Sequence, residues 1–109
     1  MARQKGLDAV QKEKVRSFVA LIKKQGITVS RVILFGSYAK GKSTPDSDID
    51  LAVISPQFGR DSMQELMLLR KLAIRIDSQL EPIPFSLSEF KDKYSSLSNE
   101  IRQYGISLD

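Results

Sequence analysis

The segment from Gly36 to Leu51 constrains this chain more than any other part of it. A short apolar run ends at a Gly-Ser pair, and eleven residues after Ser37 an Asp-Ile-Asp triplet opens a second apolar run. Side chains alternate across a strand, so Asp48 and Asp50 point to the same face. Two carboxylates at this spacing repel each other unless a cation lies between them. The segment therefore predicts two strands whose ends bring a turn and an acidic pair to one place.

The Gly-Ser pair is suited to a phosphate. Glycine at position 36 lets the backbone approach a ligand closely, and a helix that begins at Ser37 directs its N–H groups at an anion. Lys40 and Lys42 either neutralise terminal phosphates or lie in solvent as loop lysines. An isolated Asp-x-Asp is common at polar strand ends, but together with the turn it indicates a nucleotide and a hard divalent ion such as Mg²⁺.

Composition restricts the chemistry that this chain can perform. The 109 residues include no cysteine and no histidine. The first absence excludes disulfides, thiolate metal sites and cysteine nucleophiles. The second removes the commonest general base and the commonest zinc ligand. Catalysis by this chain must therefore use carboxylates, hydroxyls, amines or the backbone.

The net charge of +4 is a weaker guide to function. It favours anionic partners, although a solvated lysine-rich surface explains it as well. The basic residues of the N-terminal third are spread along a predicted helix, without the interleaved aromatic residues of single-strand binders. No run reaches the roughly 18 apolar residues of a membrane span, and the N-terminus has no apolar stretch of a secretory signal. We expect a cytoplasmic protein, with nucleic acid an unlikely partner.

The hydrophobic periodicity predicts a single domain over residues 1–109 of the α/β (α+β) class, with a small sheet flanked by helices. Helices are expected over about 8–25, 37–40, 61 onward and 86–104, and strands over 29–35, 48–55 and 80–85. Pro82 and Pro84, two residues apart, remove backbone donors on one side of the third strand, which should therefore be an open edge.

Two apolar stripes are expected to pack in the core. One lies on the helix that begins near Asp61 and includes Met63, Leu66, Met67, Leu69 and Ala73. The other follows a capping box at Ser86–Glu89, and its members are Phe90, Tyr94, Leu97, Ile101 and Tyr104. The second stripe belongs to one helix, or to two if the Ser95-Ser96 pair interrupts it. An exposed surface for a partner protein is the alternative to core packing for this stripe.

These motifs carry a family resemblance. Gly36-Ser37-x-Ala39-x-Gly41, followed by Ser47-Asp48-Ile49-Asp50-Leu51, closely resembles the signature of the DNA polymerase β-type nucleotidyltransferase superfamily. The short chain and its element order are similar to a minimal nucleotidyltransferase, the small partner of a HEPN-domain protein in bacterial two-gene modules. A Walker-type loop competes poorly, because Pro45 prevents a helix from following Gly41-Lys42-Ser43.

The resemblance implies a polymerase β-like fold with a small mixed sheet, two Mg²⁺ ions and ATP as the donor of AMP. It assigns catalysis and the metal ions to three carboxylates: Asp48, Asp50 and Glu81. It assigns the triphosphate to the turn and its lysines: Gly36, Ser37, Lys40 and Lys42. Many relatives have an aspartate where this chain has Glu81, and Asp77 is the alternative third carboxylate.

The acceptor implied by the resemblance is a tyrosine of a HEPN-type toxin, which would make this chain an antitoxin. Small-molecule acceptors such as aminoglycosides remain an alternative. A different alternative is a binding module that neutralises its partner by contact, without catalysis. Homo-oligomers and hetero-oligomers are both open at this point.

Overall fold

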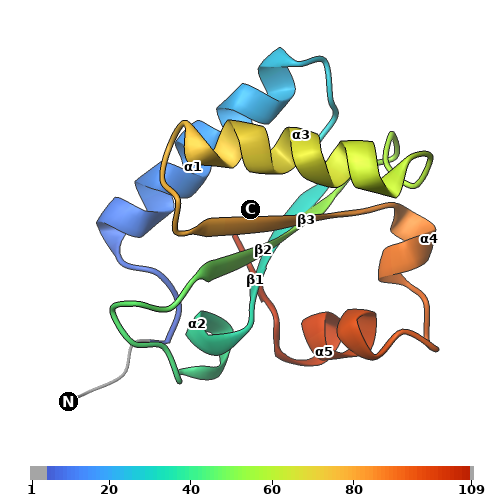
Figure 1. The fold of residues 1–109 in the computed structure, drawn as a ribbon. Coiled ribbons are helices and arrows are strands. Elements are labelled where there is room, and N and C mark those ends of the chain that lie inside the picture. Colours follow the sequence, from blue (N-terminus) through green and yellow to red (C-terminus); the bar gives the residue numbers. More distant parts are fainter. Residues whose placement is uncertain (1–4, 109) are drawn as a thin grey trace.

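The computed structural model describes residues 5–108 and places a four-stranded sheet at the centre, in the order β3-β2-β1-β4 (Figure 1). Helices lie on both faces of this sheet. The elements in chain order are α1 (Ala9–Lys24), β1 (Arg31–Phe35), α2 (Ser37–Lys40), β2 (Ile49–Ile54), α3 (Ser62–Ile74), β3 (Leu80–Phe85), α4 (Leu87–Phe90), α5 (Ser96–Tyr104) and β4 (Ile106–Ser107). The expected α+β class with a mixed sheet is confirmed.

The sheet is mixed because its central strands pair in different senses. β1 runs antiparallel to both β2 and β4, whereas β2 and β3 are parallel. The register places Phe35 opposite Asp50 and Asp50 opposite Glu81. The end of β1, the start of β2 and the start of β3 therefore lie next to one another.

The alternation of side chains along β2 divides the core into two layers. Ile49, Leu51 and Val53 face α1 and α3, where they pack with Phe18 and Leu69. Ala52 and Ile54 face the opposite side and pack with apolar residues of α4 and α5. Because side chains alternate along a strand, Asp50 points to the same face as Ala52 and Ile54, and its register partner Glu81 does the same. Both carboxylates therefore lie on the α5 face of the sheet.

The prolines of β3 lie on an edge strand, as their spacing predicted. At the two ends of the pairing, the N–H of Ile49 in β2 donates to the carbonyl of Gln79, and the N–H of Ser55, just after β2, donates to the carbonyl of Phe85. Odd-numbered residues of β3 therefore turn their backbone groups toward β2, and Pro82 and Pro84 turn away from it. The ladder loses no donor to either proline.

Side-chain caps fix where several helices begin. Asp8 forms a capping box with Gln11 at the start of α1, and Asp61 accepts a hydrogen bond from the N–H of Gln64 at the start of α3. Ser86 and Glu89 form the capping box that their sequence predicted. These bonds satisfy N–H groups that have no partner inside the helix.

The observed elements differ from the predicted ones in three places. β1 begins at Arg31, not Val29, and β2 begins just after Asp48. The C-terminal stripe divides between α4 and α5, with Ser95 as the cap of α5, which agrees with the two-helix alternative that the sequence left open. The two-residue β4 was not predicted, because a segment this short has no measurable period.

Neither apolar stripe is wholly buried, so the expectation that both pack in the core is partly wrong. On α3, Leu69 and Ala73 are buried, but Met63 and Met67 remain exposed. On the C-terminal stripe only Phe90 and Ile101 are buried, whereas Tyr94 is 85% exposed. The sheet is narrow, so helices of this length extend past the surface that they cover.

The position of the prolines can be tested with Ile83, whose N–H points toward β2 by the same alternation. We expect Ile83→Pro to lower the free energy of unfolding by about 2 kcal/mol more than Ile83→Ala, since it also removes a ladder hydrogen bond. Pro84→Ala should cost less than about 1 kcal/mol. Urea unfolding measures all three, and equal losses for the two Ile83 variants would contradict the assigned register.

Candidate functional site

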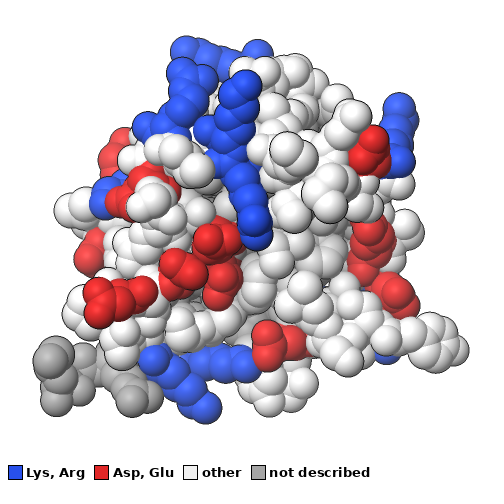
Figure 2. All heavy atoms as spheres, viewed as in Figure 1, with Lys and Arg blue, Asp and Glu red and all other residues white. Residues whose placement is uncertain are grey.

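Acidic side chains gather where β2 and β3 begin. Asp50 and Glu81 are register partners, both half-buried, and the exposed Asp48 precedes them immediately before β2. Figure 2 shows acidic side chains on this part of the surface, with basic side chains beside α2. The structure therefore brings together the three carboxylates that the sequence predicted.

Asp50 is the most perturbed of these acids. Burial, followed by the charges of Asp48, Glu81 and Glu100, raises the pKa of Asp50 from 3.8 to about 6. All of these causes disfavour the ionised carboxylate. A site with this electrostatic imbalance favours a cation.

The turn after β1 touches this carboxylate directly. Gly36 has φ +72°, and a Cβ at that position would lie 2.1 Å from Oδ2 of Asp50. Both the left-handed backbone and the missing side chain are therefore required here. The glycine at position 36 therefore lets the Asp50 carboxylate lie directly against the turn.

The element after this turn is a single helical turn, α2. The N–H of Lys42 donates to the carbonyl of Ser37 at 2.9 Å, and Gly41 closes the helix in the left-handed conformation. With four residues, α2 has a small dipole. Its usefulness for an anion therefore rests on the local N–H groups and on the half-buried Ser37 hydroxyl.

The two predicted phosphate-binding lysines differ in their surroundings. Lys40 forms an ion pair with Glu100 of α5 at 2.6 Å and lies 5.4 Å from the ring centroid of Tyr104. Lys42 is exposed. A phosphate that binds Lys40 must therefore compete with Glu100.

Glu100 and a small polar network are parts of the site that sequence reasoning missed. The Tyr38 hydroxyl accepts hydrogen bonds from Gln11 at 3.2 Å and from Gln79 at 3.1 Å. Gln79 also donates to the carbonyl of Ser47 at 2.7 Å, just before Asp48. These bonds connect α2 to the segment that precedes β2. Their partners are far apart in the chain, so no local pattern identifies them.

The proposed alternative for the third carboxylate lies elsewhere. Asp77 pairs with Lys14 of α1 at 2.5 Å, and this contact, with a hydrogen bond from the N–H of Gln79, lowers the pKa of Asp77. Asp77 does not contribute to the raised pKa of Asp50, whereas Glu81 does. Glu81 itself has a looser contact, 3.7 Å from Arg70. The geometry favours Glu81.

The donor chemistry of the site fits Mg²⁺. Among residues 5–108, no three acidic side chains are arranged to hold a metal ion on their own. Mg²⁺ commonly takes one or two protein carboxylates and completes its shell with substrate phosphates and water. The carboxylate oxygens of Asp50 and its neighbours, together with the repulsion between these acids, meet that requirement.

Comparison with known proteins identifies the family. Residues 12–108 match the profile of the nucleotidyltransferase domain family. The chain belongs to this family. The expected enzyme class, a nucleotidyltransferase, is thereby confirmed.

Individual relatives of this nucleotidyltransferase agree with the assignment. A Methanocaldococcus jannaschii protein named as a putative protein adenylyltransferase is 26% identical over 82 residues, which are 73% of this chain and 79% of the relative. A crystal structure of a toxin–antitoxin with AMP-PNP superposes with a TM-score of 0.63 at 24% identity, over 90% of this chain and 72% of the other. A crystal structure of a mutant of the toxin–antitoxin MntA-HpeT superposes with a TM-score of 0.61 at 25% identity. The match covers 87% of this chain and 71% of the other.

The raised pKa of Asp50 predicts a pH-dependent stability. Between about pH 4 and pH 6 the folded protein retains a proton that the unfolded chain has lost, so the contribution of Asp50 to the free energy of unfolding falls as pH rises. After allowance for partial exposure, Asp50→Asn should be more stable than the wild type by about 1 kcal/mol near pH 7.

Urea unfolding at several pH values measures this difference. The two proteins should become equally stable below about pH 3, where Asp50 is largely protonated in both the folded and the unfolded state. A difference that does not change with pH would mean that the substitution acts through packing or hydrogen bonding and not through charge.

Proposed function

We propose that this nucleotidyltransferase moves AMP from ATP onto a hydroxyl group of a protein partner. The contact between Gly36 and Asp50 carries the proposal, because it joins a turn open to phosphate to a carboxylate that needs a cation. The relatives named as a protein adenylyltransferase and as a toxin–antitoxin with AMP-PNP support the choice of donor and acceptor. Use of ATP and Mg²⁺ implies a cytoplasmic location.

Asp48, Asp50 and Glu81 are the residues that would hold two Mg²⁺ ions. When bound, such ions neutralise phosphate charge and stabilise the attacking and leaving oxygens of an in-line displacement. The N–H groups after Gly36 and the hydroxyl of Ser37 are the donors within this chain for the triphosphate. Lys40 and Lys42 supply positive charge beside it.

The transfer balances without any other reactant. The acceptor oxygen forms a bond to the α-phosphorus, the bond from this phosphorus to the bridging oxygen breaks, and pyrophosphate leaves. The acceptor proton passes to a carboxylate or to water, since the chain has no histidine. Glu81, at the edge of the acidic group, is the residue that would help to remove it.

The acceptor in this proposal is a tyrosine of a HEPN-type toxin, and the chain is its antitoxin. The described structure offers exposed apolar side chains for such a partner on and beside α5, including Tyr94, Leu97 and Tyr104. Tyr104 lies next to Lys40, so a partner on this surface would reach the phosphate turn.

Among residues 5–108 there is no helix long and apolar enough to cross a membrane.

The same exposed surface supports a second candidate function, a module that neutralises its partner by contact alone. Exposed large apolar residues form interfaces whether or not a reaction follows. The two functions differ in their need for Asp48 and Asp50. Neutralisation by contact would survive the loss of both carboxylates.

Transfer of label from ATP tests the principal proposal. With ATP radiolabelled at the α-phosphate and a co-purified partner protein, we expect Mg²⁺-dependent labelling of the partner. The Asp48→Asn/Asp50→Asn double variant should reduce it by at least about a thousandfold, because the residues that hold the metal ions are lost. Labelling that persists in the double variant would contradict the assignment of catalysis to Asp48 and Asp50. Neutralisation that persists without labelling would favour the contact module.

Gly36→Ala tests whether nucleotide binding needs a residue without a side chain at this position. The new methyl group would displace the Asp50 carboxylate, so we expect loss of Mg²⁺–ATP binding in calorimetry, with destabilisation by about 1–2 kcal/mol. Gly26→Ala is the matched control, since Gly26 has φ +81° and nothing lies within 4 Å of the position that a Cβ would occupy there. The control should show similar backbone strain with unchanged nucleotide affinity.

A further inference from the structure

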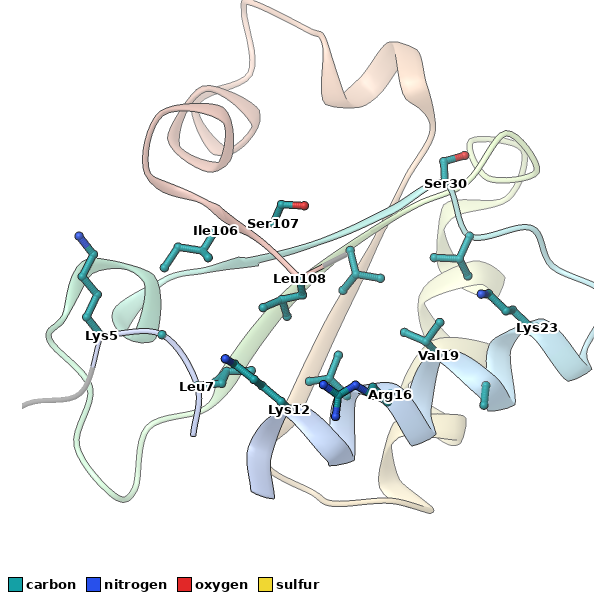
Figure 3. A pocket seen from close by; sticks show the side chains of 15 residues that line it. Lys5, Leu7, Lys12, Arg16, Val19, Lys23, Ser30, Ile106, Ser107 and Leu108 are labelled. Atoms are coloured by element: carbon teal, nitrogen blue, oxygen red, sulfur yellow. The ribbon is translucent and has the colours of Figure 1, made fainter. Parts of the chain in front are cut away.

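A groove of about 1080 Å³ lies between α1 and the β1–β4 edge of the sheet. Figure 3 shows α1 with Lys12, Arg16 and Lys23 along one side, and Ile106 and Leu108 on the opposite wall. β4 pairs with only two residues of β1, so this edge of the sheet is narrow. None of the predicted site residues lines the groove.

The lining of the groove combines an apolar floor with a basic rim. Val15 and Val32 are buried at its base, and Val19 and Leu108 are partly buried beside them. Its basic members are Lys5, Lys12, Arg16 and Lys23, and among residues 5–108 no acidic residue lines it. Arg16 pairs with the exposed Glu13 at 2.9 Å, outside the lining. The described part of the groove is therefore complementary to an anionic, partly apolar surface.

One end of the groove reaches the phosphate turn. The N–H of Gly6 donates to the carbonyl of Tyr38 in α2 at 2.8 Å. The Cβ of Lys5 lies 3.5 Å from the position that a Cβ of Gly41 would occupy. A ligand along α1 would thus end beside α2, without covering the carboxylates, which lie on the other face of the sheet.

We infer that this groove docks an acidic segment of the protein partner, one that carries apolar side chains between its carboxylates. The inference rests on the proposed function, because it concerns how the acceptor protein is held. The apolar side chains would cover Val19 and Leu108, and the carboxylates would meet Lys12 and Lys23. Contact between opposite charges speeds association and fixes the orientation of the partner.

The floor of the groove decides between this partner and nucleic acid. Single-stranded nucleic acid stacks its bases on aromatic rings, but the groove is lined by valine, isoleucine and leucine and by no aromatic residue within the described chain. Aliphatic side chains at the base of a basic rim favour an amphipathic peptide.

Fluorescence anisotropy with a synthetic peptide of alternating glutamate and leucine tests the inference. We expect this peptide to bind the full chain, and a matched peptide with serine in place of leucine to bind at least about tenfold more weakly. Raising NaCl from about 50 mM to about 300 mM should weaken binding, since the rim charges are exposed. Lys12→Glu/Lys23→Glu should lower affinity at least about tenfold, because two attractive contacts become repulsive.

The control is Lys71→Glu/Lys91→Glu, which makes the same change in net charge at exposed positions outside the groove. Equal loss in both double variants would overturn the inference in favour of a general charge effect. Failure of the peptide to bind would also overturn it, as would stronger binding of oligouridylate or of phosphatidylserine vesicles.

A separate measurement keeps this inference distinct from the proposed function. Mg²⁺–ATP binding should be the same in the wild type and in Lys12→Glu/Lys23→Glu, since both lysines lie outside the nucleotide site. Loss of the partner's labelling with intact ATP binding would support the docking surface. Absence of ATP binding in the wild type would contradict the proposed function while leaving the peptide result interpretable.

Discussion

The pairing of β1 with β2 is the constraint on which the whole site depends. It places Phe35 opposite Asp50, so the residue after Phe35 meets the carboxylate. A shift of one residue would turn Asp50 toward α1 and α3, into an apolar layer. Because that layer excludes a lone charge, the hydrophobic pattern of β2 and the position of the acid enforce the same register. The parallel pairing of β2 with β3 then places Glu81 opposite Asp50.

The site gathers like charges that a folded chain would otherwise avoid. The pKa of Asp50 is raised by burial and by three neighbouring acids, so the ionised site opposes folding. The two apolar layers on either side of the sheet offset this cost. Lys40 compensates locally, but its contact with Glu100 lies at the margin of the acidic group. A nucleotidyltransferase of this size therefore relies on its core to tolerate a group of like charges.

The sequence predicted those parts of the molecule that depend on neighbouring residues. The Gly-Ser turn, the Asp-Ile-Asp pair, the capping box at Ser86 and the edge prolines all act over a few positions, and the fold contains each of them. Glu100 was missed because fifty residues separate it from Asp50, and only tertiary structure brings them together. Tyr94 and Tyr104 continue a helical stripe, yet the narrow sheet leaves them exposed. Periodicity shows which face is apolar, but not how far the opposing surface extends.

Tyr38 connects α2 with parts of the molecule that lie beyond the Gly-Ser turn. Its hydroxyl holds Gln11 of α1 and Gln79, and its carbonyl accepts from Gly6, so α2 is tied to the segment that forms one end of the groove. Such a tie is a physical route by which the two regions can be coupled. Under the proposed function, any factor by which a partner docked in the groove changes the affinity for nucleotide equals the factor by which the nucleotide changes the affinity for that partner. In that proposal, the hydrogen bonds of Tyr38 would link the binding of substrate to the binding of the target protein.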